Sequence, residues 1–94
     1  MERLKIKATK RMKQDTNRVK KQGKDISKLE RVLDILSVQR TLPPEYNDHK
    51  LRGNKAGLRE CHIEPDWLLV YKILEDRLIL LATATGSHSE ILGL

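Results

Sequence analysis

Three histidines are the residues of this sequence best suited to moving protons near neutral pH. His49 and His62 lie in a segment, residues 49–71, that also holds several cations, and His88 follows the next apolar run. An imidazole both accepts and donates a proton near pH 7, which suits a two-step relay. Cleaving RNA needs such a relay: a base on the 2′-hydroxyl, an acid on the leaving 5′-oxygen, and cations for the charge that builds on the phosphate.

The groups that would hold a phosphodiester lie beside the first two histidines. They are the cations Lys50, Arg52, Lys55 and Arg59. Trp67, or Tyr71, would stack on a base. The structural alternative is that an isolated histidine is an ordinary surface or hydrogen-bonded residue, and that Trp67, next to two leucines, belongs to the core.

Other kinds of site fit these residues less well. The three histidines have no standard zinc-ligand spacing, and Cys61 and His62 would point to opposite faces of a strand. Cys61 shares strand parity with Arg59 and Ile63, where a cysteine is more often an inert core residue than a nucleophile. The glycines at positions 53 and 57 lack the strand-loop-helix setting of a nucleotide-binding loop. We therefore expect neither a metal nor a cofactor.

The first half of the chain has one strand pattern and two helical patterns. Alternation over Leu4–Ala8 predicts a half-buried strand. Thr9 is suited to cap a basic, weakly amphipathic helix that ends at Gly23. Apolar residues spaced by three and four predict a second helix over residues 26–40, capped by Asp25 or by a Ser27 capping box. Two prolines end this helix.

The second half of the chain reads as a loop and three strands. The loop covers residues 42–56, and strand-like runs follow over residues 58–63, 67–74 and 77–85. Short separations between the runs predict antiparallel neighbours. The order is therefore β-α-α-β-β-β in a single α+β domain over residues 1–94, a small antiparallel sheet with two N-terminal helices packed on one face. The other face is left for polar function.

Charge is unevenly distributed along the 94 residues. The net charge is +6, but residues 1–28 hold 11 Lys and Arg against 3 acidic residues, and the remainder is slightly acidic. This asymmetry favours a polyanion or an acidic protein as partner of the basic first helix, over a merely solvated helix face. A small DNA-binding regulator would need a recognition helix, which the strand-rich second half does not favour.

Cellular location is bounded by three features. No apolar run approaches the length of a membrane span, and the first residues do not resemble a secretory signal. One cysteine cannot form an internal disulfide, so a reducing cytoplasm is expected.

Three segments together resemble the YafQ branch of the RelE-type toxins. Residues 42–51 resemble the family's loop, residues 59–71 its central strand pair, and residues 86–90 its C-terminal signature. The resemblance covers nearly the whole chain and agrees with the β-α-α-β-β-β layout. It implies a toxin of a type II toxin–antitoxin pair, which cuts messenger RNA in the A site of the translating ribosome by metal-free transfer of the phosphate to the 2′-oxygen.

The resemblance also implies partners and roles for individual residues. The partners would be a RelB- or DinJ-like antitoxin, the ribosome with bound messenger RNA, and operator DNA only through the antitoxin complex. His62 and His88 would be the proton-transfer pair, with His49 assisting at the phosphate and Asp66 orienting an imidazole. Trp67 falls on an active-site aromatic position. The basic first helix, with Lys10 and Arg11, would hold ribosomal RNA.

Two positions depart from the family pattern. Ala84 stands where the family usually has an arginine that stabilises charge on the phosphorane, and Leu92 stands where it often has an aromatic residue. Loss of one such charge-stabilising donor costs on the order of 10²–10³-fold in rate. The alternative to a ribonuclease is therefore a catalytically inactive module that still binds RNA, the ribosome or an antitoxin.

Overall fold

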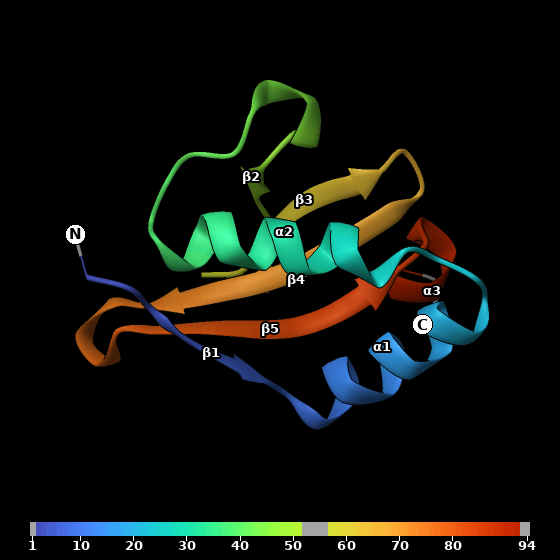
Figure 1. The fold of residues 1–94 in the computed structure, drawn as a ribbon, viewed down its shortest axis with the longest axis horizontal. Helices are drawn as coiled ribbons and strands as arrows, with labels where there is room; N and C mark the ends of the chain where they lie inside the picture. The colour runs from blue at the N-terminus through green and yellow to red at the C-terminus, as the bar shows by residue number, and fades with distance from the viewer. Residues whose placement is uncertain (1, 52–56, 93–94) are drawn as a thin grey trace.

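The computed structural model describes residues 2–51 and 57–92, in which a strand, two helices, four strands and a short helix follow one another (Figure 1). The strands are β1 (Lys5–Ala8), β2 (His49–Lys50), β3 (Arg59–Glu64), β4 (Trp67–Leu74) and β5 (Ile79–Gly86). The helices are α1 (Lys10–Lys21), α2 (Ile26–Ser37) and α3 (His88–Leu92). Within the described residues, 3₁₀ turns lie at Pro44–Tyr46 and Glu75–Arg77. None of the described helices is long and apolar enough to cross a membrane.

The five strands form one sheet in the order β1-β5-β4-β3-β2. Pairing is antiparallel from β2 to β5, as their short connections require, whereas β1 pairs in parallel with β5. The antiparallel pairing was predicted from the sequence, and the parallel pairing of the edge strand β1 was not. A parallel neighbour needs a long crossover, and here nearly the whole chain separates the two strands.

The first two helices are capped by residues that lie next to their ends in the sequence. The Thr9 hydroxyl accepts a hydrogen bond from the Met12 amide at 3.0 Å and so starts α1. Gly23, with φ of +85°, lies just beyond its end. Asp25 caps α2 by accepting from the Ser27 amide at 3.0 Å, which decides between the two caps that the sequence allowed.

Both long helices cover the same face of the sheet, as predicted (Figure 1). Their apolar residues form one core with inward-facing residues of β3, β4 and β5. The main members are Met12, Val19, Leu29, Val32, Leu36, Cys61, Ile63, Trp67, Leu69, Tyr71, Leu80 and Ala82. Burial raises the pKa of the Cys61 thiol to about 12, which agrees with an inert core cysteine.

Strand β1 differs from the prediction of a half-buried strand. Leu4, just before it, is 2% exposed, but all four residues of β1 are exposed, including Ile6 at 42%. β1 is exposed because it lies at the edge of the sheet, where the layer formed by the two long helices ends. A period-two pattern over five residues cannot distinguish an edge from a half-buried strand.

A register shift between β4 and β5 decides which residues face the site. Tyr71 pairs with Ala82 and Val70 pairs with Ala84, which leaves Thr83 as the extra residue of a β-bulge. Beyond the bulge, Thr85 turns toward the helices and Ala84 turns to the opposite face. There Ala84 packs with Leu68, Val70 and Ile91 in a second, smaller apolar cluster.

Candidate functional site

The sheet face opposite the two long helices carries the first part of the site. Glu60 and His62 alternate with the buried Cys61 and Ile63 along β3, so their side chains point away from the core. His49 of β2 lies directly across from Glu60 in the antiparallel register, on the same face. Two of the three histidines are therefore neighbours although they are 13 positions apart in the sequence.

His88 joins this group because of how β5 ends. Gly86 has φ of +153°, and a Cβ there would lie 2.6 Å from Arg18 Nη2 and 2.9 Å from Glu90 Oε1. The next turn is closed by a reciprocal capping box, in which the Ser87 amide donates to Glu90 at 2.9 Å and the Glu90 amide donates to the Ser87 hydroxyl at 3.2 Å. His88 is thereby fixed as the first residue of α3.

The three imidazoles lie in one row, with His62 between the other two. The ring centroids are 6.4 Å apart for His49 and His62, and 5.5 Å apart for His62 and His88. The side chains of His49 and His88 are 42% and 47% exposed, and that of His62 is 21% exposed. The row is therefore open to a substrate from solvent.

Two of the imidazoles have defined outer partners. His88 Nδ1 lies 2.7 Å from Asp66 Oδ1, in the turn between β3 and β4, and the His88 amide donates to the same oxygen at 2.9 Å. His49 Nδ1 lies 2.7 Å from the Asn47 carbonyl oxygen. A carbonyl oxygen only accepts, so His49 Nδ1 is the donor and a neutral ring carries its lone pair on Nε2.

Hydrogen bonding keeps the Asp66 carboxylate ionised. The His88 amide first, and the His88 ring second, lower the pKa of Asp66 below its ordinary value. An ionised Asp66 can only accept, so His88 Nδ1 is the donor in this pair and Nε2 is the free nitrogen.

Glu60 is a site residue that was not predicted from the sequence. It is 6% exposed, and its Oε1 lies 3.7 Å from His49 Nε2 and 3.9 Å from His62 Nε2. The signal was present in the sequence, because Glu60 precedes His62 by two residues on a strand and must share its face. One ligand atom from each of Glu60, His62 and His88 lies within 4.8 Å of the others, so these three side chains could hold a metal ion.

Three residues expected at the RNA-binding surface are buried or face the core. Trp67 is 0% exposed and donates its indole N–H to the Thr85 hydroxyl at 2.9 Å, and Tyr71 is 1% exposed. Neither ring can stack on a base, which corrects that expectation. Both lie on the β4 face that meets the helices, where apolar packing outweighs a surface role.

Arg59 also lies on the helix-covered side of β3. Its Nη2 lies 3.0 Å from Asp48 Oδ2 and its Nε donates to the Tyr71 hydroxyl at 3.3 Å. The Tyr71 hydroxyl in turn donates to Asp48. The hydrogen bond to Asp48 is the main cause of the raised pKa of Arg59. Arg59 therefore fixes the segment before β2 and does not face the imidazole row.

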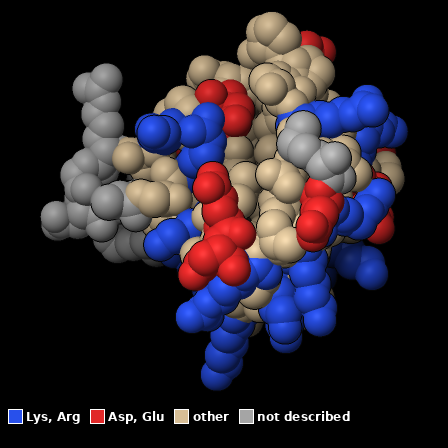
Figure 2. All heavy atoms as spheres, turned by 90° about the vertical axis from the view of Figure 1, so that its left-hand side faces the viewer, with Lys and Arg blue, Asp and Glu red and all other residues tan. Residues whose placement is uncertain are grey.

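The remaining predicted cations fall into two groups. Lys50 is exposed on β2, and Lys10 is exposed at the start of α1. Arg52 and Lys55 lie outside the described residues. Figure 2 shows Lys and Arg side chains gathered along its lower margin, the side on which β1 and α1 lie in Figure 1.

The side chain of Arg11, in α1, contacts the last helix, α3, near the site. Its Nη2 donates to the Glu90 carbonyl oxygen at 3.3 Å, and its Nε lies 3.3 Å from Asp15 Oδ2. Arg11 also borders a hollow of about 280 Å³ whose floor includes Val70 and Ala84. Ala84 is 5% exposed and contributes only a methyl group there. The side chain of Leu92 is outside the described part of the structure.

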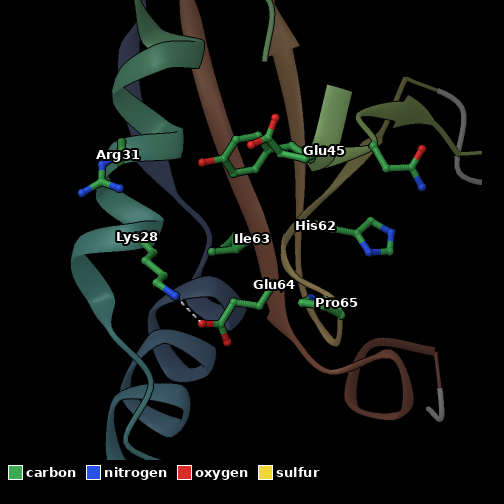
Figure 3. Close-up of a pocket in the computed structure, with 9 residues that line it drawn as sticks. Lys28, Arg31, Glu45, His62, Ile63, Glu64 and Pro65 are labelled. Atoms are coloured by element: carbon green, nitrogen blue, oxygen red, sulfur yellow. Dashed lines mark hydrogen bonds and ion pairs between the residues drawn. The ribbon is translucent and has the colours of Figure 1, made fainter. Parts of the chain in front are cut away.

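A larger hollow, of about 430 Å³, lies on the other side of β3 and is lined by Lys28, Arg31 and Tyr46, among others (Figure 3). Lys28 Nζ lies 2.7 Å from Glu64 Oε2 there. Figure 3 shows the His62 ring directed away from Lys28 and Arg31. His62 is itself one of the residues that line this hollow, so the hollow adjoins the imidazole row at that residue, although the ring points away from the two cations.

Comparisons with known proteins agree over most of the chain. The family model described as a bacterial toxin of type II toxin–antitoxin system, YafQ, matches residues 4–93. The mRNA interferase toxin YafQ of Escherichia coli strain K12 is 37% identical over 81 residues, which cover 84% of this chain and 85% of that protein.

Solved structures give the same result. A metal-bound toxin from Helicobacter pylori is 39% identical, with a TM-score of 0.89 over 94% of this chain and 98% of that one. The E. coli DinJ–YafQ toxin–antitoxin complex contains a chain that is 35% identical, with a TM-score of 0.87 over 97% of this chain and 99% of that one.

Proposed function

The chain belongs to the YafQ family of toxins of bacterial type II toxin–antitoxin systems, and from this we propose that it cleaves messenger RNA. The cut would be made in the ribosomal A site by transfer of the phosphate to the 2′-oxygen, without a metal. The observation that carries the proposal is the pair of solvent-accessible imidazoles, His62 and His88, 5.5 Å apart between ring centroids, with Asp66 behind one of them. The name mRNA interferase, which the E. coli relative bears, supports it.

His62 and His88 would make the two proton transfers. One neutral imidazole takes the proton of the 2′-hydroxyl as the 2′-oxygen bonds to phosphorus. The bond from phosphorus to the 5′-oxygen breaks, and the other ring, as imidazolium, protonates that oxygen. Attacking and leaving oxygens lie on opposite sides of the phosphorus, so two separate rings are needed. The products are a cyclic phosphate and a 5′-hydroxyl.

Asp66 would act as a positioning residue. It holds His88 through the backbone amide and through Nδ1, which directs Nε2 away from Asp66 and fixes the tautomer of the neutral ring. When His88 is protonated, the carboxylate also offsets its charge. This is the general way in which an acid partner orients a catalytic imidazole.

His49 and Glu60 would organise the other end of the row. As an imidazolium, His49 would assist at the phosphate, and its ring is fixed by the Asn47 carbonyl. Glu60, nearly buried beneath His49 and His62, offsets positive charge when either ring is protonated. Lys50 with Arg52 and Lys55 would add positive charge along the RNA strand.

The basic surface would hold ribosomal RNA through its phosphates. Lys10 and Arg11 belong to the cation-rich N-terminal third of the chain, and contacts of this kind are sequence-blind and weaken with salt. The same charge would attract an acidic antitoxin. The complex of the E. coli relative with DinJ supports an antitoxin partner for this chain.

One observation favours a second candidate function, an antitoxin-binding toxin fold that does not cut RNA. Ala84 lies on the imidazole face of the sheet, packed among Leu68, Val70 and Ile91, and supplies no charge. Arg11 borders the same hollow, but Asp15 and the Glu90 carbonyl already hold its guanidinium. A missing cation at this place should slow phosphoryl transfer on the order of 10²–10³-fold.

A translation extract separates the two candidates. The wild-type chain and its Ala84→Arg variant are added to a reporter message, and new RNA ends are mapped against the codon in the A site. We expect cuts within A-site codons from both proteins, faster from Ala84→Arg, and no loss of activity when zinc and copper are chelated. If neither protein produces new ends, the ribonuclease proposal fails and the binding candidate stands.

A further inference from the structure

We propose that Arg18 of α1 is a positioning residue for the reaction: together with Glu90 it holds the first turn of α3, and through that turn it fixes the place of the His88 ring. The effect on cleavage rests on the proposed function, whereas the effect on His88 itself does not. Neither Arg18 nor Glu90 is one of the proton-transferring groups, so both would act only through His88.

Helix α3, which begins with His88, is too short to hold its own conformation. It has five residues, and isolated helices below about 12–15 residues are marginal in water because the first turn is costly to form. Asp66 accepts two hydrogen bonds from His88, but the Asp66 side chain is itself 70% exposed and gives no rigid anchor. Contacts from elsewhere in the chain must therefore hold α3 against the sheet.

The Arg18 guanidinium joins α1 to the end of β5 and to α3. Nη1 donates to Asp15 Oδ1 at 2.7 Å, and Nη2 donates to the Thr85 carbonyl oxygen at 2.8 Å. Nε lies 2.9 Å from Glu90 Oε2, as an ion pair without a hydrogen bond. Asp15 is 4% exposed and also accepts from the Thr85 amide at 3.1 Å. A planar guanidinium held on three sides has little freedom left.

Gly86 allows the guanidinium to come this close to the backbone. A Cβ at this position would lie 2.6 Å from Arg18 Nη2 and 2.9 Å from Glu90 Oε1, so any other residue would push the ion pair apart. The next two residues along the chain are Ser87 and His88. The guanidinium therefore restrains the backbone immediately before the catalytic imidazole.

Glu90 carries the restraint from α1 into the turn that begins α3. Its Oε1 accepts from the Ser87 amide at 2.9 Å, while its Oε2 accepts from Gln22 Nε2 at 2.9 Å and pairs with Arg18. Its carbonyl oxygen accepts from Arg11. The three α1 residues are spaced by seven and four positions, so they share one face of the helix. The Ser87 amide first, and Gln22 second, lower the pKa of Glu90, which keeps the carboxylate ionised.

The turn in turn determines where His88 can act. It places the His88 amide 2.9 Å from Asp66 Oδ1, and the ring follows the backbone. Without the contact to α1, the ring would spend less time in the geometry that proton transfer requires. Because binding of RNA depends on other groups, loss of Arg18 should lower kcat and leave KM unchanged.

The first arm of the test examines His88 without RNA, by NMR of the full ¹⁵N-labelled chain. We compare the wild type with Arg18→Gln and with Glu90→Gln, in which an amide oxygen can still accept from Ser87 while the charge that pairs with Arg18 is lost. We expect hydrogen exchange of the His88 amide to quicken at least about 10-fold and the ring nitrogen signals to shift, while amides of β4 stay protected. The matched control is Arg77→Gln, in the exposed turn before β5, at the opposite end of that strand from α3, and it should leave His88 unchanged.

The second arm measures cleavage on purified programmed ribosomes. We expect kcat to fall about 10- to 100-fold in Arg18→Gln and Glu90→Gln at unchanged KM, and less in Arg18→Lys, which keeps the charge. The double variant should be no slower than the slower single one, because the two residues act as a unit. Glu90→Gln leaves the Arg18–Asp15 pair intact, so it tests the contact even if Arg18→Gln does not fold.

Wild-type exchange of the His88 amide in folded Glu90→Gln would overturn the inference. A raised KM with unchanged kcat in the same variant would also overturn it, because the contact would then serve RNA binding. Absence of cleavage from every protein, the wild type included, would contradict the proposed function, while exchange and ring signals of His88 would still decide whether Arg18 and Glu90 position it.

Discussion

Asp66 accepts two hydrogen bonds from His88 on one carboxylate oxygen, from the backbone amide at 2.9 Å and from Nδ1 at 2.7 Å. The two residues are 22 positions apart and belong to the turn after β3 and the first turn of α3. Their contact joins the start of β4 to the end of β5, its neighbour in the sheet, at the place where the imidazoles lie.

Replacing Asp66 with asparagine should slow cleavage and leave RNA affinity nearly unchanged. The Asn carbonyl can still accept from the His88 amide, but its N–H₂ group can turn to donate to Nδ1, which would favour the wrong tautomer. We expect kcat to fall on the order of 10- to 100-fold, and ring nitrogen chemical shifts of His88 to report the tautomer change. Asp76→Asn, in the exposed turn before β5, is the control. Wild-type kcat in Asp66→Asn would remove the positioning role.

The pH dependence of the same contact has a definite sign. The folded-state pKa of Asp66 is lowered, so the contact adds stability above the unfolded-state value of about 3.9 and loses it as pH falls through the folded-state value. We expect the carboxyl carbon of Asp66 to titrate below that unfolded-state value in NMR spectra. In His88→Ala the midpoint should rise only part of the way, because the amide hydrogen bond remains. An unchanged midpoint would show that the His88 ring does not act on Asp66.

Cys61 should be chemically silent in the folded protein. Burial raises its pKa to about 12, so almost no thiolate is present at pH 8. We expect iodoacetamide to leave the native chain unmodified at pH 8 and to modify it fully in urea. Cys61→Ala should cost on the order of 1 kcal/mol of stability and leave cleavage per folded molecule unchanged. Rapid alkylation of the native chain would mean that the core opens more readily than its packing implies.

Asp15 should be a stability residue although it lies on a basic surface helix. It is 4% exposed, accepts from the Thr85 amide at 3.1 Å, and pairs with Arg18 at 2.7 Å. Asp15→Ala would leave a buried amide without a partner and should cost about 2–3 kcal/mol in urea unfolding. Asp34→Ala, on the exposed side of α2, should cost much less. Equal losses from the two variants would contradict the role of Asp15.

Local signals in the sequence predicted most of the fold. Thr9 and Gly23 mark the ends of α1 because a cap and a left-handed residue act over a few positions. The strand β2 at His49–Lys50 and the 3₁₀ turn before it were read as loop, since two residues carry no periodicity. The parallel pairing of β1 depends on contacts across the whole chain, which no local pattern encodes.

The candidate site was predictable in part. Strand alternation placed His62 on the uncovered face, and Glu60 should have been placed with it by the same rule. Trp67 was misassigned because residue type does not reveal which face of a buried strand meets the core. The outward turn of Ala84 depends on the bulge at Thr83, which comes from pairing between strands and has no sign in the sequence of either one.

The central claim is that His62 and His88 share the two proton transfers, and single-turnover cleavage of ribosome-bound message tests it most directly. The measurement uses whichever parent cuts faster, the wild type or Ala84→Arg, and compares it with His62→Ala, His88→Ala and the double variant, each checked for folding by circular dichroism. We expect each single change to lower the rate about 10²- to 10⁴-fold, and the double change to add little, because residues that act as a unit are not additive. A folded single variant that cuts at the parent rate would contradict the account.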